Sequence, residues 1–370
     1  MEGLESKQRI FILSLHRACE NSSYYLSKIE TFLKTNEYEI VGDIARSNIV
    51  IINTCAYSDK MQLFNEKVIS EIVSSFPDKI IFIYGCLVHL TGLHETDHLI
   101  FVKNSEIDRF SEIFSHVVPL QSCHSDRLSH FDNYQDHITR QDYFVQICQG
   151  CCNQCSYCNI KLAKGEVKSR PVKYLQEEVR RLVTENRFEI TLLADDCGSY
   201  GYDIGSNIVE LMSELINMHE QLRFKIYTIF PNLLLKYYEW LRPFFKEQRI
   251  TYVCAPLQSG STRILKLMNR DYNFSKLKEC LKDIKTLSPN TYLFTHFMIN
   301  FPTETIQDFE KSLELAGAFD SSMFIPYQEN KRTLAYRIRP KCTQEGLTDK
   351  INRLKHCINH RIFHAVLVGN

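Results

Sequence analysis

The stretch ICQGCCNQCSYCNIKLAKGEVKSRP, residues 147–171, places three cysteines at the spacing C-x3-C-x2-C. They are Cys151, Cys155 and Cys158, and the aromatic Tyr157 stands directly before the third. A loop this short can wrap three thiolates around one face of an iron–sulfur cube and leave the fourth iron open. An open iron can chelate the amino and carboxylate groups of a small molecule. The spacing therefore predicts a [4Fe–4S] cluster that also binds a small molecule.

A zinc site is the main alternative for these cysteines. Zinc takes four ligands, usually Cys or His at set spacing, and no histidine lies between His137 and His219. A zinc site would therefore need Cys148 or Cys152 as its fourth ligand. The aromatic residue before the third cysteine favours the cluster over zinc and over a chance spacing.

Strand-like and helix-like segments alternate on both sides of this loop. Before it, the apolar runs at 9–15, 48–53 and 79–84 are typical of buried parallel strands separated by helices. After it, the alternation continues to about residue 326 and provides about six βα units, fewer than the eight of a closed TIM barrel. The polar segment at 121–141, rich in His, Ser and Asp, is typical of a linker.

Composition narrows the class of protein. The chain has 370 residues and 14 cysteines, and its 44 Lys+Arg balance its 44 Asp+Glu. It shows no apolar secretion signal at its N-terminus and no membrane-spanning run, so we expect a cytoplasmic protein with no membrane partner. Reduced thiols at this density indicate metal or redox chemistry rather than disulfides. A net charge of zero exerts no overall attraction on nucleic acid.

Three further cysteines lie near the ends of the predicted N-terminal strands. Cys55 ends one strand, Cys86 follows the next, and Cys19 lies a few residues past the first. Because the carboxyl ends of neighbouring parallel strands face one crevice, these thiols can converge. Geometry alone leaves open whether they form a site or are three unrelated cysteines. If they converge, a second cluster with an open iron is the natural occupant.

Together these features resemble the methylthiotransferase branch of the radical S-adenosylmethionine (SAM) enzymes, over roughly residues 9 to 335. The segments that carry the resemblance are VIINTC (50–55), IYGC (83–86), QGCCNQCSYCNI (149–160), KSRP (168–171), DDCGSYGYD (195–203), PLQSGSTRILKLMNRDY (256–272), INFPTET (299–305) and YQENKRTLA (327–335).

The resemblance implies an α/β fold in four parts. A Rossmann-like parallel-sheet domain at 1–120 would carry an auxiliary cluster, and a linker at 121–141 would follow it. A radical SAM partial (β/α)6 barrel would occupy 142–340. The last part is a helical tail at 341–370, without the small β-barrel module, called TRAM, in which the family usually ends.

The same resemblance implies two [4Fe–4S] clusters, SAM as cofactor and an external electron donor of the flavodoxin or ferredoxin kind. The expected reaction inserts a methylthio group into an unactivated C–H bond. The implied metal ligands are Cys151, Cys155 and Cys158 for the SAM cluster and Cys19, Cys55 and Cys86 for the auxiliary cluster.

Six residues are candidates for holding SAM. Two carboxylates at a strand end would meet its ammonium group or ribose hydroxyls, and an arginine its carboxylate. A glutamine would bond the ribose or the carboxylate, and two aromatic rings would flank the adenine. They are, in that order, Asp195, Asp196, Arg170, Gln258, Tyr157 and Phe301. For each, the simpler alternative is an ordinary strand-end polar group or a core aromatic residue.

Several positions depart from the family pattern. Cys19 follows SLHRA where the family has SLG, which makes its ligand role the least secure of the six. The other departures are expected to reshape the substrate pocket. They are Lys161 in place of proline, His296 in place of aspartate, and Asn300, Thr303 and Arg332 in place of glycines.

The neutral charge and the expected lack of TRAM favour a peptide or protein side chain as the substrate. The alternatives are a tRNA base, a sulfur insertion without methyl transfer, and a non-catalytic iron–sulfur or zinc protein. Near the last predicted strand lies a small basic cluster, which either contacts a phosphate or acidic peptide or is a solvated loop. Its members are Lys331, Arg332, Arg337 and Arg339.

Overall fold

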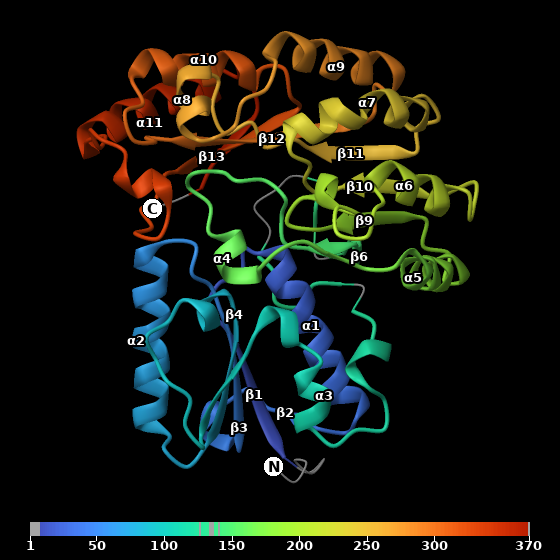
Figure 1. Ribbon diagram of the computed structural model, residues 1–370, viewed down its shortest axis with the longest axis vertical. Coiled ribbons are helices and arrows are strands. Elements are labelled where there is room, and N and C mark those ends of the chain that lie inside the picture. The colour runs from blue at the N-terminus through green and yellow to red at the C-terminus, as the bar shows by residue number, and fades with distance from the viewer. Residues whose placement is uncertain (1–7, 126, 133–136, 140, 369–370) are drawn as a thin grey trace. The chain divides into compact units, whose positions relative to one another are not determined.

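The computed structural model describes residues 8–125, 127–132, 137–139 and 141–368 (Figure 1). The chain forms two compact units. The N-terminal unit comprises Met1–Asp132 together with Asn159–Gly165, and the C-terminal unit comprises Asn133–Cys158 together with Glu166–Asn370. The segment directly after the cysteine loop therefore belongs to the N-terminal unit.

The N-terminal unit is built on a five-stranded parallel sheet with the order β2-β1-β3-β4-β5. This order has its topological switch point between β1 and β3, as in flavodoxin-like folds. The strands are β1 (Arg9–Ser14), β2 (Glu39–Ile40), β3 (Ile49–Thr54), β4 (Ile80–Gly85) and β5 (Leu99–Val102).

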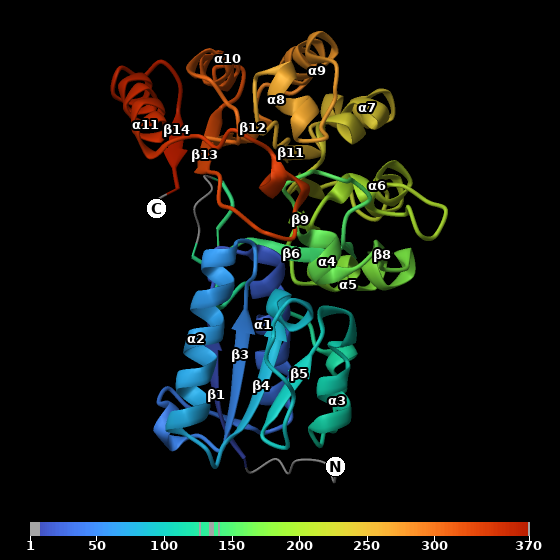
Figure 2. The ribbon, with the colours of Figure 1, turned by 60° about the vertical axis from the view of Figure 1, so that its left-hand side comes forward.

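Helices cover both faces of this sheet, which explains why its central strands are continuously apolar. On one face, Ile49 and Ile51 of β3 pack with α1 (Glu20–Thr35) and α3 (Arg109–Ile113). On the other face, Val50 and Ile52 pack with α2 (Asp59–Ser75). Figure 2 shows α2 and α3 on opposite sides of the strands.

The C-terminal unit is built on a seven-stranded sheet with the order β14-β13-β12-β11-β10-β9-β6. All of its neighbours pair in parallel. The strands are β6 (Tyr143–Gln146), β9 (Glu189–Leu193), β10 (Arg223–Ile226), β11 (Ile250–Cys254), β12 (Tyr292–Ile299), β13 (Ser321–Pro326) and β14 (Ala365–Leu367). Within the described residues the two edge strands, β14 and β6, do not pair, so the barrel is partial.

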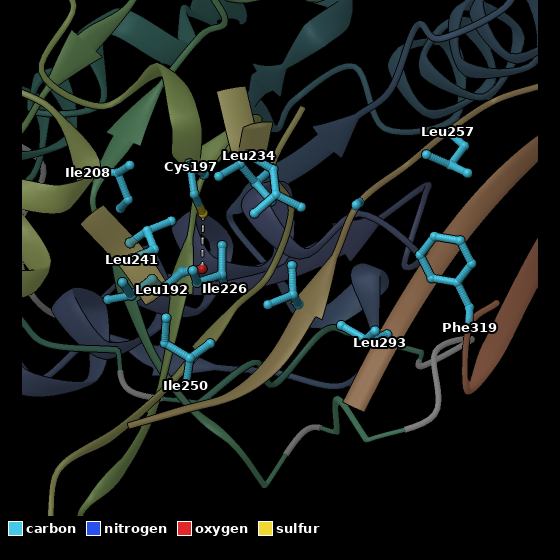
Figure 3. Packing of buried hydrophobic residues seen from close by; sticks show 14 of the residues in the cluster. Leu192, Cys197, Ile208, Ile226, Leu234, Leu241, Ile250, Leu257, Leu293 and Phe319 are labelled. Carbon is cyan, nitrogen blue, oxygen red and sulfur yellow. Dashed lines mark hydrogen bonds between the residues drawn. The ribbon is translucent and has the colours of Figure 1, made fainter. Parts of the chain in front are cut away.

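Helices between the strands cover the outside of this sheet. They are α5 (Val172–Thr184), α6 (Ile208–Ile216), α7 (Pro231–Lys246), α8 (Thr262–Leu267), α9 (Phe274–Leu287), α10 (Ile306–Ala316) and α11 (Gln344–Asn359). Figure 3 shows how Ile226 and Ile250 from the strands meet Leu234 and Leu241 from α7 in the core. The predicted fold class, a Rossmann-like sheet domain with a partial radical SAM barrel, is confirmed.

Two segments differ from their predicted form. The C-terminal segment is not only helical, because after α11 the chain adds β14, whose Ala365 pairs with Ser322. The strand is too short to show a periodicity in the sequence. The predicted linker includes residues outside the described ones, and its described part is packed: Phe131 is buried, and the Ser23 hydroxyl donates to the His130 carbonyl over 2.9 Å.

Candidate functional site

The cysteine loop starts from a short antiparallel hairpin of β7 (Cys148–Gln149) and β8 (Lys168–Ser169). Backbone amides tie the loop to the segment after β9: Gly150 N–H donates to Asp195 over 2.9 Å, and Cys152 N–H donates to the Ser199 hydroxyl over 3.1 Å. On its other side, the Ser156 hydroxyl donates to the Leu267 carbonyl over 2.7 Å. The loop is thus held at both ends within the C-terminal unit.

Cys151, Cys155 and Cys158 are partly exposed free thiols. Burial, the Asp196 carboxylate and the Cys158 thiol are among the causes that raise the pKa of Cys151 to about 12. The neighbouring Cys155 and Cys158 help to raise the pKa of Tyr157, after burial. Cys158 therefore lies near Cys151, and both Cys155 and Cys158 lie near Tyr157.

The donor chemistry of this loop fits an iron–sulfur cluster. A cube spreads its three cysteine ligands over three separate irons. Within the described part of the chain, no group of three His, Cys, Asp or Glu side chains surrounds a single metal-ion position. A thiol whose pKa is raised becomes a thiolate when a metal supplies the positive charge. Three thiols in one short loop therefore fit the donor set of such a cluster.

Arg270 is the main site residue that the sequence did not single out. Its guanidinium Nη1 lies 3.3 Å from Cys155 Sγ and 3.4 Å from the Tyr157 hydroxyl, and its carbon lies 4.0 Å from the Phe230 ring centre. It also donates to the Pro256 carbonyl, and the residue is only 3% exposed. A buried positive charge therefore lies beside the Cys155 sulfur. Arg270 lies in the segment 256–272, but no residue spacing in that segment indicates that its side chain lies near the cysteine loop.

Burial by itself lowers the pKa of Arg270. The neighbouring Tyr157 and Cys155 outweigh that effect, so the pKa stays above its ordinary value. The side chain therefore remains a permanent positive charge next to the cysteine loop.

Asp195 and Asp196 lie beside the cysteine loop, as the sequence predicted for strand-end carboxylates, and both bond to the protein. Asp195 accepts the Gly150 amide already described. Asp196 accepts two backbone amides, from Gly198 over 3.1 Å and Phe230 over 2.9 Å. Its other oxygen accepts the Ser199 hydroxyl over 2.6 Å and the Asn153 amide over 2.9 Å. Asp196 thus organises the loop, and direct SAM contacts by either carboxylate stay a prediction.

Arg170 and Gln258 are likewise engaged within the protein. The Arg170 guanidinium pairs with both carboxylate oxygens of Glu178, over 3.1 and 2.7 Å. Gln258 has a positive φ of 71°, and its backbone bridges to β12 by accepting the Met298 amide over 2.9 Å. These bonds show how the protein holds the Arg170 guanidinium and the Gln258 backbone. They do not test the predicted contacts of the two residues with SAM.

The two predicted aromatic residues stand edge to face. The rings of Tyr157 and Phe301 have centroids 6.4 Å apart at 79°, and Phe301 also meets Tyr327 at 5.4 Å. Both rings lie in the C-terminal unit, with Tyr157 in the cysteine loop and Phe301 directly after β12. An adenine contact by this pair stays a prediction.

Three departures from the family pattern have visible physical consequences. Asn300 and Thr303, which replace glycines, have φ values of 66° and 72°. Asparagine tolerates this left-handed region, but β-branched threonine is strained there. His296, which replaces aspartate, has its Nε2 3.8 Å from Cys254 Sγ. Burial, aided by Arg270, lowers the pKa of His296 to about 4, so its imidazole is neutral at pH 7.

In the N-terminal unit, the three predicted cysteines lie at the carboxyl ends of neighbouring strands. Cys19 is the N-cap of α1 after β1, Cys55 follows β3, and Cys86 begins the 3-10 helix η2 (Cys86–His89) after β4. Burial raises the pKa of Cys19 to about 12 and that of Cys55 well above its usual value. Cys86 adds to both shifts, and Cys19 adds to that of Cys55. These three cysteines, the N-terminal triad, thus lie at neighbouring strand ends, and their role as ligands of one cluster stays a prediction.

Two local features hold this triad. Gly85, directly before Cys86, has a φ of 113°, and a Cβ there would lie 2.4 Å from the Thr54 carbonyl oxygen. Only glycine allows β4 to approach the end of β3 so closely. The amide of Asn65 supports the second cysteine, because its oxygen accepts the Cys55 N–H over 3.0 Å.

Lys164, in the short helix α4 (Ile160–Lys164), is a second residue that the sequence analysis missed. Its ammonium group lowers the pKa of both Cys19 and Cys55, against the effect of burial, and the residue is only 9% exposed. Asn104 joins α4 to the triad, since its amide nitrogen lies 3.4 Å from the Ala163 carbonyl and 3.9 Å from Cys86 Sγ.

A cavity of about 700 Å³ lies elsewhere in the C-terminal unit, beside α11. Its lining includes Thr303, Glu304 and Lys350, and none of the predicted site residues. Glu304 and Lys350 form a buried ion pair there, with Nζ 3.1 Å from Oε2. Burial raises the pKa of Glu304 to about 7 in spite of this pairing.

Comparison with known families found one matching family model in each of the two units. Residues 145–316 match the model of the radical SAM superfamily, and residues 13–102 match the uncharacterized protein family UPF0004. A solved radical SAM methyltransferase from Kitasatospora setae is similar in fold, with a TM-score of 0.57 at 12% identity. That match covers 89% of this chain and 77% of the other.

Two curated relatives are more similar in sequence. A tRNA-2-methylthio-N(6)-dimethylallyladenosine synthase from Clostridium botulinum is 27% identical over 92% of this chain and 80% of the relative. A probable threonylcarbamoyladenosine tRNA methylthiotransferase from Pyrococcus abyssi is 30% identical over 75% of this chain and 67% of the relative.

These relatives contradict the prediction of a peptide or protein substrate, since both are named for reactions on tRNA. The prediction relied on the neutral net charge, which is a sum over the whole chain and does not report how charge is distributed. Peptide modification is therefore wrong as the main interpretation. Among the described helices, none has both the length and the apolar character needed to span a membrane.

Proposed function

Because the chain belongs to the radical SAM methylthiotransferase family, we propose that it inserts a methylthio group at a C–H bond of an adenosine in tRNA. The observation that carries the proposal is the similarity to a tRNA methylthiolating relative across 92% of this chain, which includes both units. The two relatives are named for differently substituted adenosines, a dimethylallyl group on N6 in the first and a threonylcarbamoyl group in the second. We therefore infer an N6-substituted adenosine as the substrate nucleoside.

We also propose that the chain holds two [4Fe–4S] clusters. Cys151, Cys155 and Cys158 would hold the SAM cluster, and the triad of the N-terminal unit would hold the auxiliary cluster. Support comes from three thiols within one short loop and from three more at the ends of neighbouring parallel strands. When bound, the SAM cluster supplies the electron that cleaves SAM, and the auxiliary cluster supplies sulfur; the electron itself would come from a flavodoxin- or ferredoxin-like protein.

The chain's own residues would orient the reactants and tune the charge around them. Arg270 would stabilise the cluster-bound Cys155 thiolate, as its 3.3 Å contact suggests. Asp196, through Asn153, would hold the conformation of the cysteine loop. Neutral His296 is suited to hydrogen bonding with an uncharged purine edge, where the family's aspartate would carry a negative charge.

Nucleoside analysis tests this function. The anaerobically reconstituted protein would be incubated with SAM, a reductant and tRNA that carries N6-substituted adenosine but lacks the methylthio group. We expect a nucleoside in which a methylthio group has replaced one hydrogen, and none with Cys151→Ala. A Cys280→Ala variant serves as the matched control, since Cys280 is a buried thiol of α9 outside both triads.

The alternatives give different products in the same experiment. A thiol in place of the methylthio group would mean sulfur insertion without methyl transfer. Cleavage of SAM with unmodified tRNA, for adenosines with either N6 substituent, would reject the proposed substrate. An intact cluster that never cleaves SAM would identify a non-catalytic iron–sulfur protein.

A further inference from the structure

The segment after β13, residues 327–341, is called here the basic loop. It contains five cationic side chains and a single carboxylate, that of Glu329. Four of the cations are exposed, and the fifth, Lys341, is half-buried and pairs with Glu329 over 2.8 Å. The exposed cations are Lys331, Arg332, Arg337 and Arg339. A chain with no net charge thus concentrates positive charge in one short segment of the C-terminal unit.

The basic loop is attached to the cysteine loop. The backbone amide of Ala335 donates to the Ser156 carbonyl over 2.8 Å, and Ser156 lies between Cys155 and Cys158 in the sequence. Ala335 belongs to the 3-10 helix η6 (Leu334–Arg337), so a residue of the cationic segment itself makes this bond. The backbone of the basic loop is therefore attached directly to the cysteine loop.

Aromatic rings connect the same two segments. Tyr157 of the cysteine loop meets Phe301, and Phe301 meets Tyr327 at the start of the basic loop. The Lys341 ammonium then lies 5.9 Å from the Tyr327 ring centre and 5.1 Å from that of Tyr336. Cations interleaved with aromatic rings suit single-stranded RNA, because phosphates bind to the cations and bases stack on rings.

An exposed apolar side chain lies between these cations. Leu334 is 66% exposed at the start of η6, whereas its neighbours Thr333 and Ala335 are buried. The buried neighbours fix the turn, so Leu334 points away from the protein core. An apolar side chain in this position can pack against a base that has left its stack.

We propose that the basic loop binds the phosphate backbone of the substrate RNA and thereby places the target adenosine at the cysteine loop. This inference rests on the proposed function, because it takes tRNA as the substrate. It adds the surface that recognises the RNA. Contacts with phosphates position an RNA chain without reading its sequence. Such positioning is needed to present one nucleoside at the reacting site.

The test compares two triple variants that each remove three exposed positive charges from the C-terminal unit. The loop variant is Lys331→Gln/Arg332→Gln/Arg337→Gln. The control variant is Lys276→Gln/Lys278→Gln/Lys282→Gln, whose lysines lie on the exposed side of α9. Binding of an unmodified full-length tRNA transcript would be measured over a series of salt concentrations.

We expect the loop variant to bind the transcript about tenfold or more weakly at low salt. The slope of log K against log salt should fall in magnitude by about 2 to 3, since each lost phosphate contact removes about 0.7 to 0.9. The control variant should keep the wild-type affinity and slope. Iron content and cleavage of SAM in the absence of RNA should match wild type in both variants, because the Ala335–Ser156 bond between the two loops is a backbone bond that neither variant removes.

The possible failures are distinguishable. If wild type methylthiolates tRNA but the loop variant keeps its affinity and slope, the loop inference is wrong and the proposed function stands. An equal loss of binding in both triple variants would also overturn the inference, because it would mean attraction to charge in general. If wild type neither binds nor modifies tRNA, both the function and the inference fail.

Discussion

Arg270 shows how one residue tunes a site from a distant part of the sequence. It lies 115 positions from Cys155, yet its guanidinium is 3.3 Å from that sulfur and is enclosed by Phe230 and Pro256. If Cys155 holds the proposed SAM cluster, this permanent, buried positive charge would favour the more negative, reduced state of that cluster.

Replacing Arg270 should change the reduction potential of the SAM cluster. We expect a more negative potential in Arg270→Gln, because the lost cation no longer stabilises the added electron, and a smaller shift in Arg270→Lys. A potentiometric titration followed by electron paramagnetic resonance measures this. Arg242→Gln, which removes an exposed arginine of α7 paired with Asp283, is the control and should leave the potential unchanged. Equal potentials in Arg270→Gln and wild type would contradict the assigned role.

His296 should make stability depend on pH. Its pKa is about 4 in the folded protein, below the ordinary value of 6.5, because burial disfavours the charged form. Between these two values the unfolded chain binds the extra proton, so His296 should lower stability as the pH falls from 6.5 toward 4. Denaturant unfolding of wild type and His296→Gln over this range measures the difference. Parallel pH profiles for the two proteins would show that His296 is not the cause.

At the scale of elements, α11 is attached to the barrel through one buried charge pair. Lys350 and Glu304 have side chains that are 4% and 0% exposed, and the Lys350 ammonium also donates to the Asn300 side-chain oxygen over 3.0 Å. Glu304 lies just before α10, so the pair joins the end of the β12 loop to the last helix. Without Lys350, the Glu304 carboxylate would be buried unpaired or would have to take up a proton, and either change costs folding free energy.

Lys350→Met should therefore destabilise the protein by about 3 to 5 kcal/mol. Lys355→Met is the matched control, because Lys355 is exposed on the same helix and its replacement should change stability little. The double variant Lys350→Met/Glu304→Gln should regain part of the loss, since no buried carboxylate then remains. Thermal and denaturant unfolding measure all three, and a Lys350→Met protein as stable as the Lys355→Met protein would rule out the role of the pair.

For the whole molecule, the two thiol triads predict the iron content. Reconstituted wild type should hold about eight irons per chain, as two [4Fe–4S] clusters require. A Cys151→Ala/Cys155→Ala/Cys158→Ala variant and a Cys19→Ala/Cys55→Ala/Cys86→Ala variant should each hold about four. Iron and sulfide analysis with Cys280→Ala as control measures this. About four irons in wild type, falling to none in the first variant, would exclude the auxiliary cluster.

Much of the fold and part of the site could be predicted from the sequence, for reasons that are local. The C-x3-C-x2-C spacing identified the cysteine loop because three ligands within eight residues need no tertiary information. The apolar runs at 48–53 and 79–84 indicated parallel strands because both faces of these strands are covered by helices. The order of such units then predicted the fold class, which is confirmed.

Other features depended on tertiary structure, because they join residues that no spacing relates. Arg270 and Lys164 each place a positive charge near thiols that lie far away in sequence or on other elements. The bonds of Asp196 with Asn153 and of Arg170 with Glu178 also join residues that no spacing relates, and the predicted SAM contacts of Asp196 and Arg170 stay predictions. Strand β14 is recognisable only by its pairing with β13.

The sequence by itself determined the chemistry of the cysteine loop and the parallel α/β architecture, since ligand spacing and hydrophobic periodicity are properties of short segments. The tertiary structure decided which residues surround the cysteines near three strand ends, Lys164 and Asn104 among them. It also decided that the basic loop is bonded to Ser156 within the cysteine loop. Net charge did not reveal this positive segment, because it is a sum over the whole chain and does not report where each charged residue lies. The folded structure determines those positions.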